Sequence, residues 1–298
     1  MKPLRVNPKY AWWFLAVWIA GCCSLFSRPL LSTIRYALAN DNSSHILLVP
    51  FIVGWLLYLD RRKLIADHLD LRAALVFALP ASFLVALGLA RPSAISTLPL
   101  TVWMLGFVLL VVAGFAALFG GAGASGARFP LLFLLFFIPI PDAVLNKFIH
   151  SLQAGSAAVA GFMFDCTGIP ALREGFVFRL PTMSIEVAPE CSGIRSSMAL
   201  VILAVLVSHF AFSKLWKKTL FVAAGLLMMI VKNGIRIATL TILANYVDPD
   251  FLYGRLHHQG GVVFFLIGLG LLLPVYLWLR RGEPSLESRQ GSPAVAET

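Results

Sequence analysis

The sequence of 298 residues is 59% hydrophobic and only 13% charged, and its mean hydropathy is +0.85. Ordinary soluble domains carry roughly 25% charged residues, so the composition excludes a soluble enzyme and indicates a polytopic membrane protein. The formal net charge of +10 is spread over short loops beside apolar segments. It is not gathered on one polar domain, which argues against nucleic-acid binding.

Apolar stretches recur along the chain and predict an all-α membrane protein with about eight transmembrane helices. The first stretch contains Cys22 and Cys23, which we expect to be packing residues. The second and fifth stretches are short and need tilt or flanking residues to cross a bilayer. The predicted spans are residues 10–27, 45–59, 71–90, 98–119, 129–140, 192–212, 217–246 and 259–279.

Basic clusters between these spans predict their orientation, because short cytoplasmic loops are enriched in Lys and Arg. With eight spans, every cluster falls on the cytoplasmic side, and so do both chain ends. Residues 1–281 then form the transmembrane domain, and the Ser-, Pro- and Glu-rich residues 282–298 form a disordered cytoplasmic tail. The clusters are Lys2, Arg5 and Lys9; Arg61, Arg62 and Lys63; Arg128; Lys214, Lys217 and Lys218; and Arg280 and Arg281.

Two segments between the fifth and sixth spans differ from simple membrane helices. Residues 145–164 have helical character but include polar side chains such as Lys147 and Gln153. A ninth span here would move the Lys214–Lys218 cluster outside, so we expect an interfacial or re-entrant helix on the outer face. Residues 174–187 contain two β-like runs around Pro181 and Thr182, which predict a small extracytoplasmic hairpin.

The next segment, Ala188-Pro-Glu-Cys-Ser-Gly-Ile-Arg-Ser-Ser197, places a cysteine and an arginine at the mouth of the sixth span. In a helix that begins at Ser192, Cys191 and Arg195 lie one turn apart on one face. A neighbouring guanidinium favours the thiolate, which is the nucleophilic form of cysteine. The alternative is a small apolar cysteine beside an arginine that reaches the interface.

Two later segments bring further polar groups to the same depth. Arg236 follows Lys218 by 18 residues, or about 27 Å of helix, and so reaches the outer boundary. Lys232 lies one turn deeper, and Asn233-Gly234 is expected to loosen the helix locally. His257 and His258 open the last span from the same side. The alternatives are a lipid-facing Arg236 and histidines that only cap a helix.

A thiol, a guanidinium and an imidazole in one layer supply a nucleophile, an oxyanion stabiliser and a proton-transfer group. These are the parts that acyl transfer through a thioester requires. The sequence contains no Gly-rich phosphate loop and no metal-type Cys/His spacing, so we expect neither a cofactor nor a metal.

Three blocks of the chain resemble the signature of the exosortase/archaeosortase family. They are Glu190-Cys-Ser-Gly-Ile-Arg-Ser196, Asn233-Gly-Ile-Arg-Ile237, and His257 followed by Gly261 and Phe265. Ser44-His-Ile-Leu-Leu-Val-Pro-Phe51 and Phe136-Phe-Ile-Pro-Ile-Pro141 are also similar to family segments. The resemblance covers residues 40–280 and depends on the order and spacing of the blocks.

The resemblance implies an integral-membrane cysteine transpeptidase or protease of the inner membrane, with its active site at the extracytoplasmic face. Such enzymes process exported proteins whose C-terminal sorting signal has a short motif (Pro-Glu-Pro in many bacteria), a transmembrane helix and a basic cluster. An amine-bearing acceptor or water then resolves the intermediate. Carried onto this sequence, the catalytic residues are Cys191, Arg236 and His257, and His258 is the alternative to His257. The resemblance gives supporting roles to Glu190, Arg195, Lys232 and Asn233.

Two other classes of function remain open from the residues alone. In a transporter or flippase for an anionic lipid-linked sugar, Arg195, Lys232 and Arg236 would bind phosphate and the thiol would be incidental. A non-catalytic membrane scaffold would tolerate all the polar substitutions. Cys191→Ala separates the enzyme from both, because only the enzyme requires the thiol.

Overall fold

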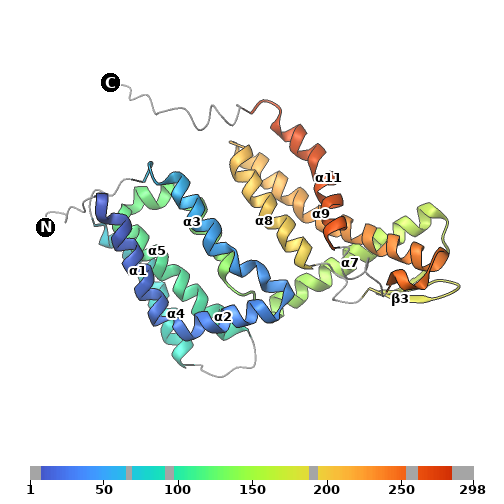
Figure 1. Cartoon of the computed structure of the whole chain (residues 1–298), viewed down its shortest axis with the longest axis horizontal. Coiled ribbons are helices and arrows are strands. Elements are labelled where there is room, and N and C mark those ends of the chain that lie inside the picture. The colour runs from blue at the N-terminus through green and yellow to red at the C-terminus, as the bar shows by residue number, and fades with distance from the viewer. Residues whose placement is uncertain (1–7, 65–68, 91–96, 188–193, 253–260, 284–298) are drawn as a thin grey trace. The chain divides into compact units, whose positions relative to one another are not determined.

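The computed structural model describes residues 8–64, 69–90, 97–187, 194–252 and 261–283. The chain divides into two compact units, residues 1–145 and 146–298. Helices make up most of both units (Figure 1). The predicted all-α membrane class is therefore confirmed.

Unit 1 is built around α5, whose apolar side chains are largely buried. Helix α1 runs antiparallel beside α5: the rings of Trp12 and Phe119 lie 4.9 Å apart and those of Phe26 and Trp103 lie 5.7 Å apart. Helix α4 is also a neighbour of α5 (Figure 1). The elements of this unit are α1 (Pro8–Leu25), α2 (Ser27–Ala39), η1 (Asp41–Leu47), α3 (Val49–Asp60), α4 (Leu71–Ala90), α5 (Leu98–Gly126), α6 (Arg128–Phe133) and η2 (Leu134–Phe137).

Asp70 marks one end of unit 1. Its Oδ1 accepts a hydrogen bond from the Ala73 N–H in the first turn of α4 at 3.0 Å, and its Oδ2 accepts one from the Gly121 N–H at 3.3 Å. The preceding residue, Gly120, breaks α5 with a φ of 66°, a conformation that glycine adopts without steric cost. The carboxylate therefore caps α4 and binds the broken helix beside it.

Thr97 marks the opposite end of unit 1. Its N–H donates to the Asp142 carboxylate at 3.1 Å, and its hydroxyl accepts from the Asp142 N–H at 2.8 Å. The Thr101 hydroxyl donates to the Pro139 carbonyl at 2.8 Å. The segment that begins with α6 near the end of α5 thus returns to the start of α5. The predicted fifth span is not a separate long helix here: Arg128–Phe137 is long and apolar enough only together with Asp142–Thr167, across a bend of 93°.

Unit 2 contains three apolar helices that pack together. Helices α8 and α9 are antiparallel, with the Phe212 and Phe221 rings 5.3 Å apart beside the connecting turn, and α11 packs against both. Figure 1 shows these three helices side by side. The elements are α7 (Asp142–Thr167, which begins at the end of unit 1), β1 (Leu172–Glu174), β2 (Val177–Arg179), β3 (Ser184–Glu186), α8 (Ile194–Ala211), α9 (Leu215–Tyr246), η4 (Pro249–Leu252) and α11 (Gly261–Arg280).

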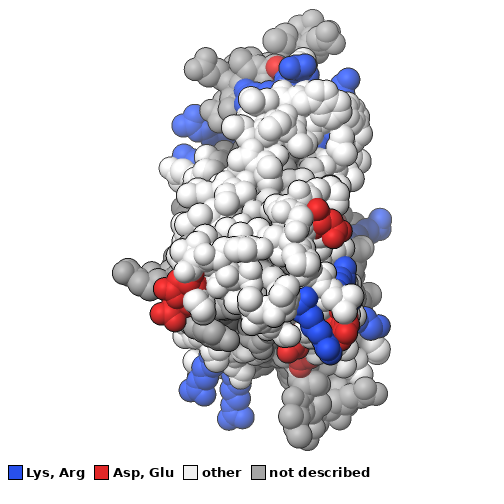
Figure 2. All heavy atoms as spheres, turned by 90° about the vertical axis from the view of Figure 1, so that its right-hand side faces the viewer, with Lys and Arg blue, Asp and Glu red and all other residues white. Residues whose placement is uncertain are grey.

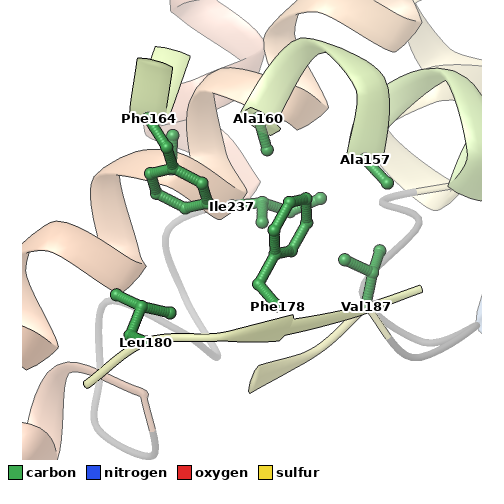
Figure 3. Close-up of a cluster of buried hydrophobic side chains, with 8 residues drawn as sticks. Ala157, Ala160, Phe164, Phe178, Leu180, Val187 and Ile237 are labelled. Carbon is green, nitrogen blue, oxygen red and sulfur yellow. The ribbon is translucent and has the colours of Figure 1, made fainter. Parts of the chain in front are cut away.

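The predicted hairpin is present and carries one additional strand. Strands β2 and β3 pair antiparallel with Phe178 opposite Ile185, and β1 pairs with the other edge of β2. Figure 3 shows the inner side of this sheet, where Phe178 packs between α7 and α9. The Phe178 and Phe164 rings lie 5.2 Å apart. The sheet is thus fixed to α7 and to α9, and α9 carries part of the predicted site.

The number of spans is close to the prediction. Five helices are long and apolar enough to cross a membrane, or up to seven if each of two bent pairs counts as one span. Helix α8, which the structure describes from Ile194, is apolar but shorter than these candidate spans. Figure 2 shows that uncharged side chains cover most of the face it draws, and that Lys, Arg, Asp and Glu form separate small groups on it. This pattern agrees with a membrane-embedded protein.

Candidate functional site

Three predicted site residues lie on one helix, α9, and the structure places all three. Lys232 and Asn233 are each 1% exposed, and Arg236 is half-buried. Arg236 follows Lys232 by one helical turn, so both side chains emerge on the same face of α9. Two cationic groups are therefore adjacent on α9.

Lys232 connects α9 to the start of α8. Its Nζ donates a hydrogen bond of 2.5 Å to the Ser196 hydroxyl, and its methylene stem lies against Gly268 of α11. Within the described ranges no Asp or Glu forms an ion pair with this lysine. A buried ammonium without a carboxylate is costly. Such a group is a functional-site hypothesis, and its only described partner, Ser196, directly follows Arg195.

Asn233 and Gly234 connect α9 to α7. The Asn233 Nδ2 donates to the Ser156 hydroxyl at 3.0 Å. A Cβ on Gly234 would lie 2.5 Å from the Cβ of Val159, so any side chain here would push the two helices apart. The predicted local loosening at Asn233-Gly234 is wrong, because α9 is continuous through both residues. The glycine instead allows a close helix–helix approach.

Two buried polar atoms in this region have no hydrogen-bond partner among the residues that the structure describes. They are the Asn233 Oδ1 and the Ser197 Oγ. Ser197 lies in the first turns of α8, next to the Ser196 that Lys232 binds. Buried polar atoms normally have partners. These two atoms therefore add hydrogen-bonding capacity beside Lys232.

Gln153 of α7 fixes the chain just before the predicted cysteine segment. Its Nε2 donates to the Val187 carbonyl at 2.8 Å, in a buried position. Val187 also packs with Ile237, the residue after Arg236, in the cluster of Figure 3. Polar contacts from two buried side chains, Gln153 and Lys232, thus hold Val187 and Ser196, which lie before and after the predicted cysteine segment.

Several predicted site residues lie outside the described residues: Glu190, Cys191, His257 and His258. Arg195 is in the first turn of α8, where only its backbone is described. The structure brings together Lys232, Asn233 and Arg236 with the start of α8. The meeting of the thiol, guanidinium and imidazole stays a prediction.

Sequence reasoning missed the roles of Gln153, Ser156 and Ser196. The polar residues of 145–164 predict an interfacial or re-entrant helix, and the 93° bend before α7 is compatible with a re-entrant segment. The pattern does not predict that Gln153 binds the Val187 carbonyl or that Ser156 binds Asn233 of α9. Gln153 and Ser156 lie three residues apart among small Ala and Gly residues, which places them on one helix face. This spacing is the feature of the sequence that could have predicted their inward contacts.

The start of α9 holds a second buried lysine, in a different environment. Lys217 forms an ion pair with Glu283 at 3.0 Å and donates to the Arg281 carbonyl at 3.1 Å. The Ser213 N–H also donates to Glu283, at 3.0 Å. Burial opposes ionisation of Glu283, but the hydrogen bonds from Lys217 and Ser213 outweigh it and lower the pKa of this carboxyl from 4.5 to about 2.

This contact joins the turn between α8 and α9 to the end of α11. The Lys214–Lys218 cluster and Arg280–Arg281 therefore lie at one end of unit 2, as the orientation prediction requires. Among the described residues there is no group of three or more His, Cys, Asp or Glu side chains that could hold a metal ion.

Comparison with known proteins supplies the family. A family model described as a transmembrane exosortase (Exosortase_EpsH) matches residues 37–274 of this chain. No curated protein and no solved structure gives a significant match. The matched region includes the residue blocks around Cys191, Arg236 and His257.

Proposed function

The chain belongs to the transmembrane exosortase family, and we propose that it is a membrane-embedded cysteine transpeptidase or protease of the inner membrane. Its substrates are exported proteins that carry a C-terminal sorting signal, composed of a short Pro-Glu-Pro-like motif, a transmembrane helix and a basic cluster. The signal's helix enters laterally from the bilayer, and its motif reaches the outer boundary of the membrane at the depth of Arg236. The retained part of the substrate is passed to an amine-bearing acceptor or to water.

In the proposed reaction, the Cys191 thiolate attacks the scissile carbonyl carbon and forms a tetrahedral oxyanion. The Arg236 guanidinium, with Arg195 in support, donates hydrogen bonds to that oxyanion. The carbon–nitrogen bond then breaks, and His257 gives its proton to the leaving amine. An amine or water then attacks the resulting thioester and gives a proton to His257, and the sulfur leaves as the thiolate.

The observation that carries this proposal is the pair of polar contacts that buried side chains make on either side of the cysteine segment. Gln153 holds Val187 and Lys232 holds Ser196, and both anchoring side chains stand on helices that Asn233 and Ser156 connect. Arg236 lies one turn from Lys232 on the same helix. A fixed frame of this kind suits a nucleophile that must meet an oxyanion donor in a defined geometry.

The transporter alternative requires cationic side chains along an open path. Lys232 is 1% exposed and its stem is packed against α11. A lysine enclosed in this way does not line such a path, which favours the enzyme.

The deciding experiment replaces the thiol. Cys191→Ala should leave a membrane-inserted protein while full-length substrate accumulates in cells that also express a reporter with the sorting signal. Cys23→Ala is the matched control, because Cys23 is exposed on α1 in the other unit, and it should process the reporter normally. Normal processing by Cys191→Ala would exclude the thioester mechanism.

A further inference from the structure

Helix α2 differs from every predicted span and lies mostly before the region that the family model matches. It follows α1 after a bend of 80°. Helix α1 runs along α5, which is long enough to cross the membrane, and the Trp18 indole N–H donates to the Leu110 carbonyl of α5 at 2.9 Å. A helix turned by 80° from that direction lies close to the membrane plane. Because Phe26 contacts Trp103, α2 begins at the Thr97 end of unit 1.

The side chains of α2 divide into three faces. Thr33 and Ala37 are buried against the protein. Leu31, Ile34 and Leu38 form an apolar stripe and are 49%, 41% and 71% exposed. The third face carries two arginines, which the seven-residue spacing places on one side of the helix. These are Arg28 and Arg35, both exposed.

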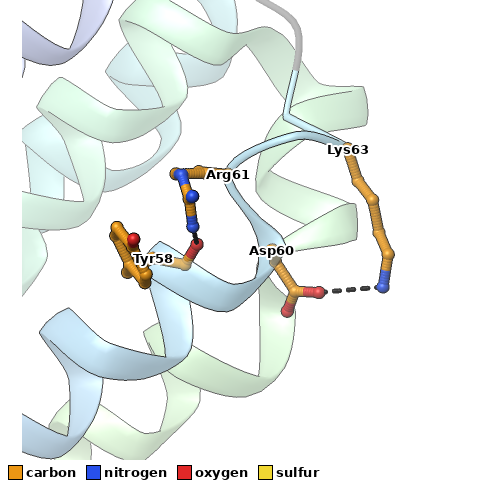
Figure 4. A network of polar contacts seen from close by, with 4 residues as sticks. All are labelled: Tyr58, Asp60, Arg61 and Lys63. Atoms are coloured by element: carbon orange, nitrogen blue, oxygen red, sulfur yellow. Dashed lines mark hydrogen bonds and ion pairs between the residues drawn. The ribbon is translucent and has the colours of Figure 1, made fainter. Parts of the chain in front are cut away.

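The two arginines differ from Arg61 at the opposite end of unit 1. The Arg61 guanidinium lies 3.6 Å from the centre of the Tyr58 ring and donates a hydrogen bond to the Tyr58 carbonyl (Figure 4). This guanidinium therefore already has partners within the chain. In the part of the chain that the structure describes, Arg28 and Arg35 form no ion pair. Their charge is thus free for an external anion.

We propose that α2 is an interfacial helix that binds phospholipid headgroups. Leu31, Ile34 and Leu38 enter the acyl-chain boundary, and the guanidinium groups of Arg28 and Arg35 bind lipid phosphates. An apolar stripe beside a cationic face is the pattern of helices that lie in the membrane surface, and planar guanidinium groups bind phosphate in bidentate fashion. A second copy is a poorer occupant, because three side chains bury far less than the roughly 800 Å² per partner of a stable interface.

Spin labels on the full chain in lipid vesicles test the placement. In a background without native cysteines, single cysteines at Leu31, Ile34, Leu38 and Ser32 would each carry a nitroxide. The first three labels should be reached by oxygen, which dissolves in the acyl region, more than by an aqueous nickel chelate. The Ser32 label, on the polar side, should show the reverse. Leu31, Ile34 and Leu38 labels that neither reagent reaches would mean that protein covers this stripe, and would overturn the proposal.

A second arm tests the headgroup. In vesicles that contain phosphatidylglycerol, the Ser32 label should be immobilised at low salt and released at high salt. Arg28→Gln with Arg35→Gln should abolish this salt dependence, whereas Arg28→Lys with Arg35→Lys should keep part of it. The control is Arg72→Gln, an exposed arginine beside the Asp70 end of unit 1, which should change nothing at Ser32. A salt response that survives the double glutamine variant would exclude phosphate binding by these arginines.

Discussion

Helix α9 buries one lysine near its start and another near its middle, and the groups around the two lysines differ. Lys217 is neutralised by Glu283 and also bound to a backbone carbonyl. Lys232 has only the Ser196 hydroxyl among its described partners and lies one turn from Arg236. A paired buried charge can be explained by fold alone, whereas a buried ammonium that is not neutralised costs stability. The contrast places the functional site of unit 2 at the middle of α9, beside Lys232.

The largest expected effect is on the rate of processing and concerns Arg236, one turn from Lys232. Lysine keeps the positive charge but loses the planar donor geometry, and loss of one oxyanion donor costs about 10²–10³ in rate. Arg236→Lys should therefore slow processing of a sorting-signal reporter by about that factor, and Arg236→Ala should slow it further. Pulse-chase labelling of the reporter measures the rate. An Arg236→Lys enzyme that works at the wild-type rate would leave the arginine as a membrane anchor only.

The two lysines provide the next test, because each can be replaced by methionine of similar length. Lys232→Met breaks the contact with Ser196 and should lower processing many-fold while the protein stays folded in detergent. Lys217→Met leaves Glu283 without its partner and should reduce thermal stability while processing at permissive temperature continues. Reporter cleavage and the melting temperature of both variants would be measured together. Equal loss of processing in both variants would contradict the distinction between a functional Lys232 and a structural Lys217.

A smaller effect is expected at Gln153, which holds Val187. Gln153→Leu preserves the volume approximately but leaves the Val187 carbonyl without its donor, at a cost of about 1–3 kcal/mol. Processing should fall with the loss of this anchor, and proteolysis between α7 and α8 should become faster. Ser151→Ala on the exposed side of the same helix is the matched control and should change neither property. A wild-type cleavage rate in Gln153→Leu would show that this anchor is dispensable.

Much of this arrangement could be predicted because membrane helices follow from hydropathy and local spacing. The apolar runs of α5 and α9, the hairpin before α8 and the common face of Lys232 and Arg236 all depend on neighbours in sequence. The amphipathic helix α2 lacks a continuous apolar run and was not predicted. The contacts of Gln153 with Val187 and of Lys232 with Ser196 join residues more than 30 positions apart. Hydropathy does not say which polar side chains will meet.

The contact of Glu283 near the start of α9 could not be predicted either. The composition of the tail does not indicate that one of its carboxylates is ordered. Only this first part of the tail is described, and it is bound to Lys217 and Ser213. The predicted disorder of the remaining tail, residues 284–298, lies outside the described residues.

The smallest expected effect is the pH dependence of this Glu283 contact. Its pKa in the folded protein is about 2, below the ordinary value of 4.5, so folding favours the ionised carboxylate. The stabilisation is complete above the unfolded pKa and is lost as the pH falls through the range between these two values. The melting temperature of the wild type should therefore exceed that of Glu283→Gln at pH 7, and the difference should shrink below pH 4.5 and vanish near pH 2. Glu186→Gln, an exposed position in β3, should show no such converging difference. A gap between wild type and Glu283→Gln that stays constant down to pH 2 would mean that the ion pair with Lys217 does not stabilise this end of unit 2.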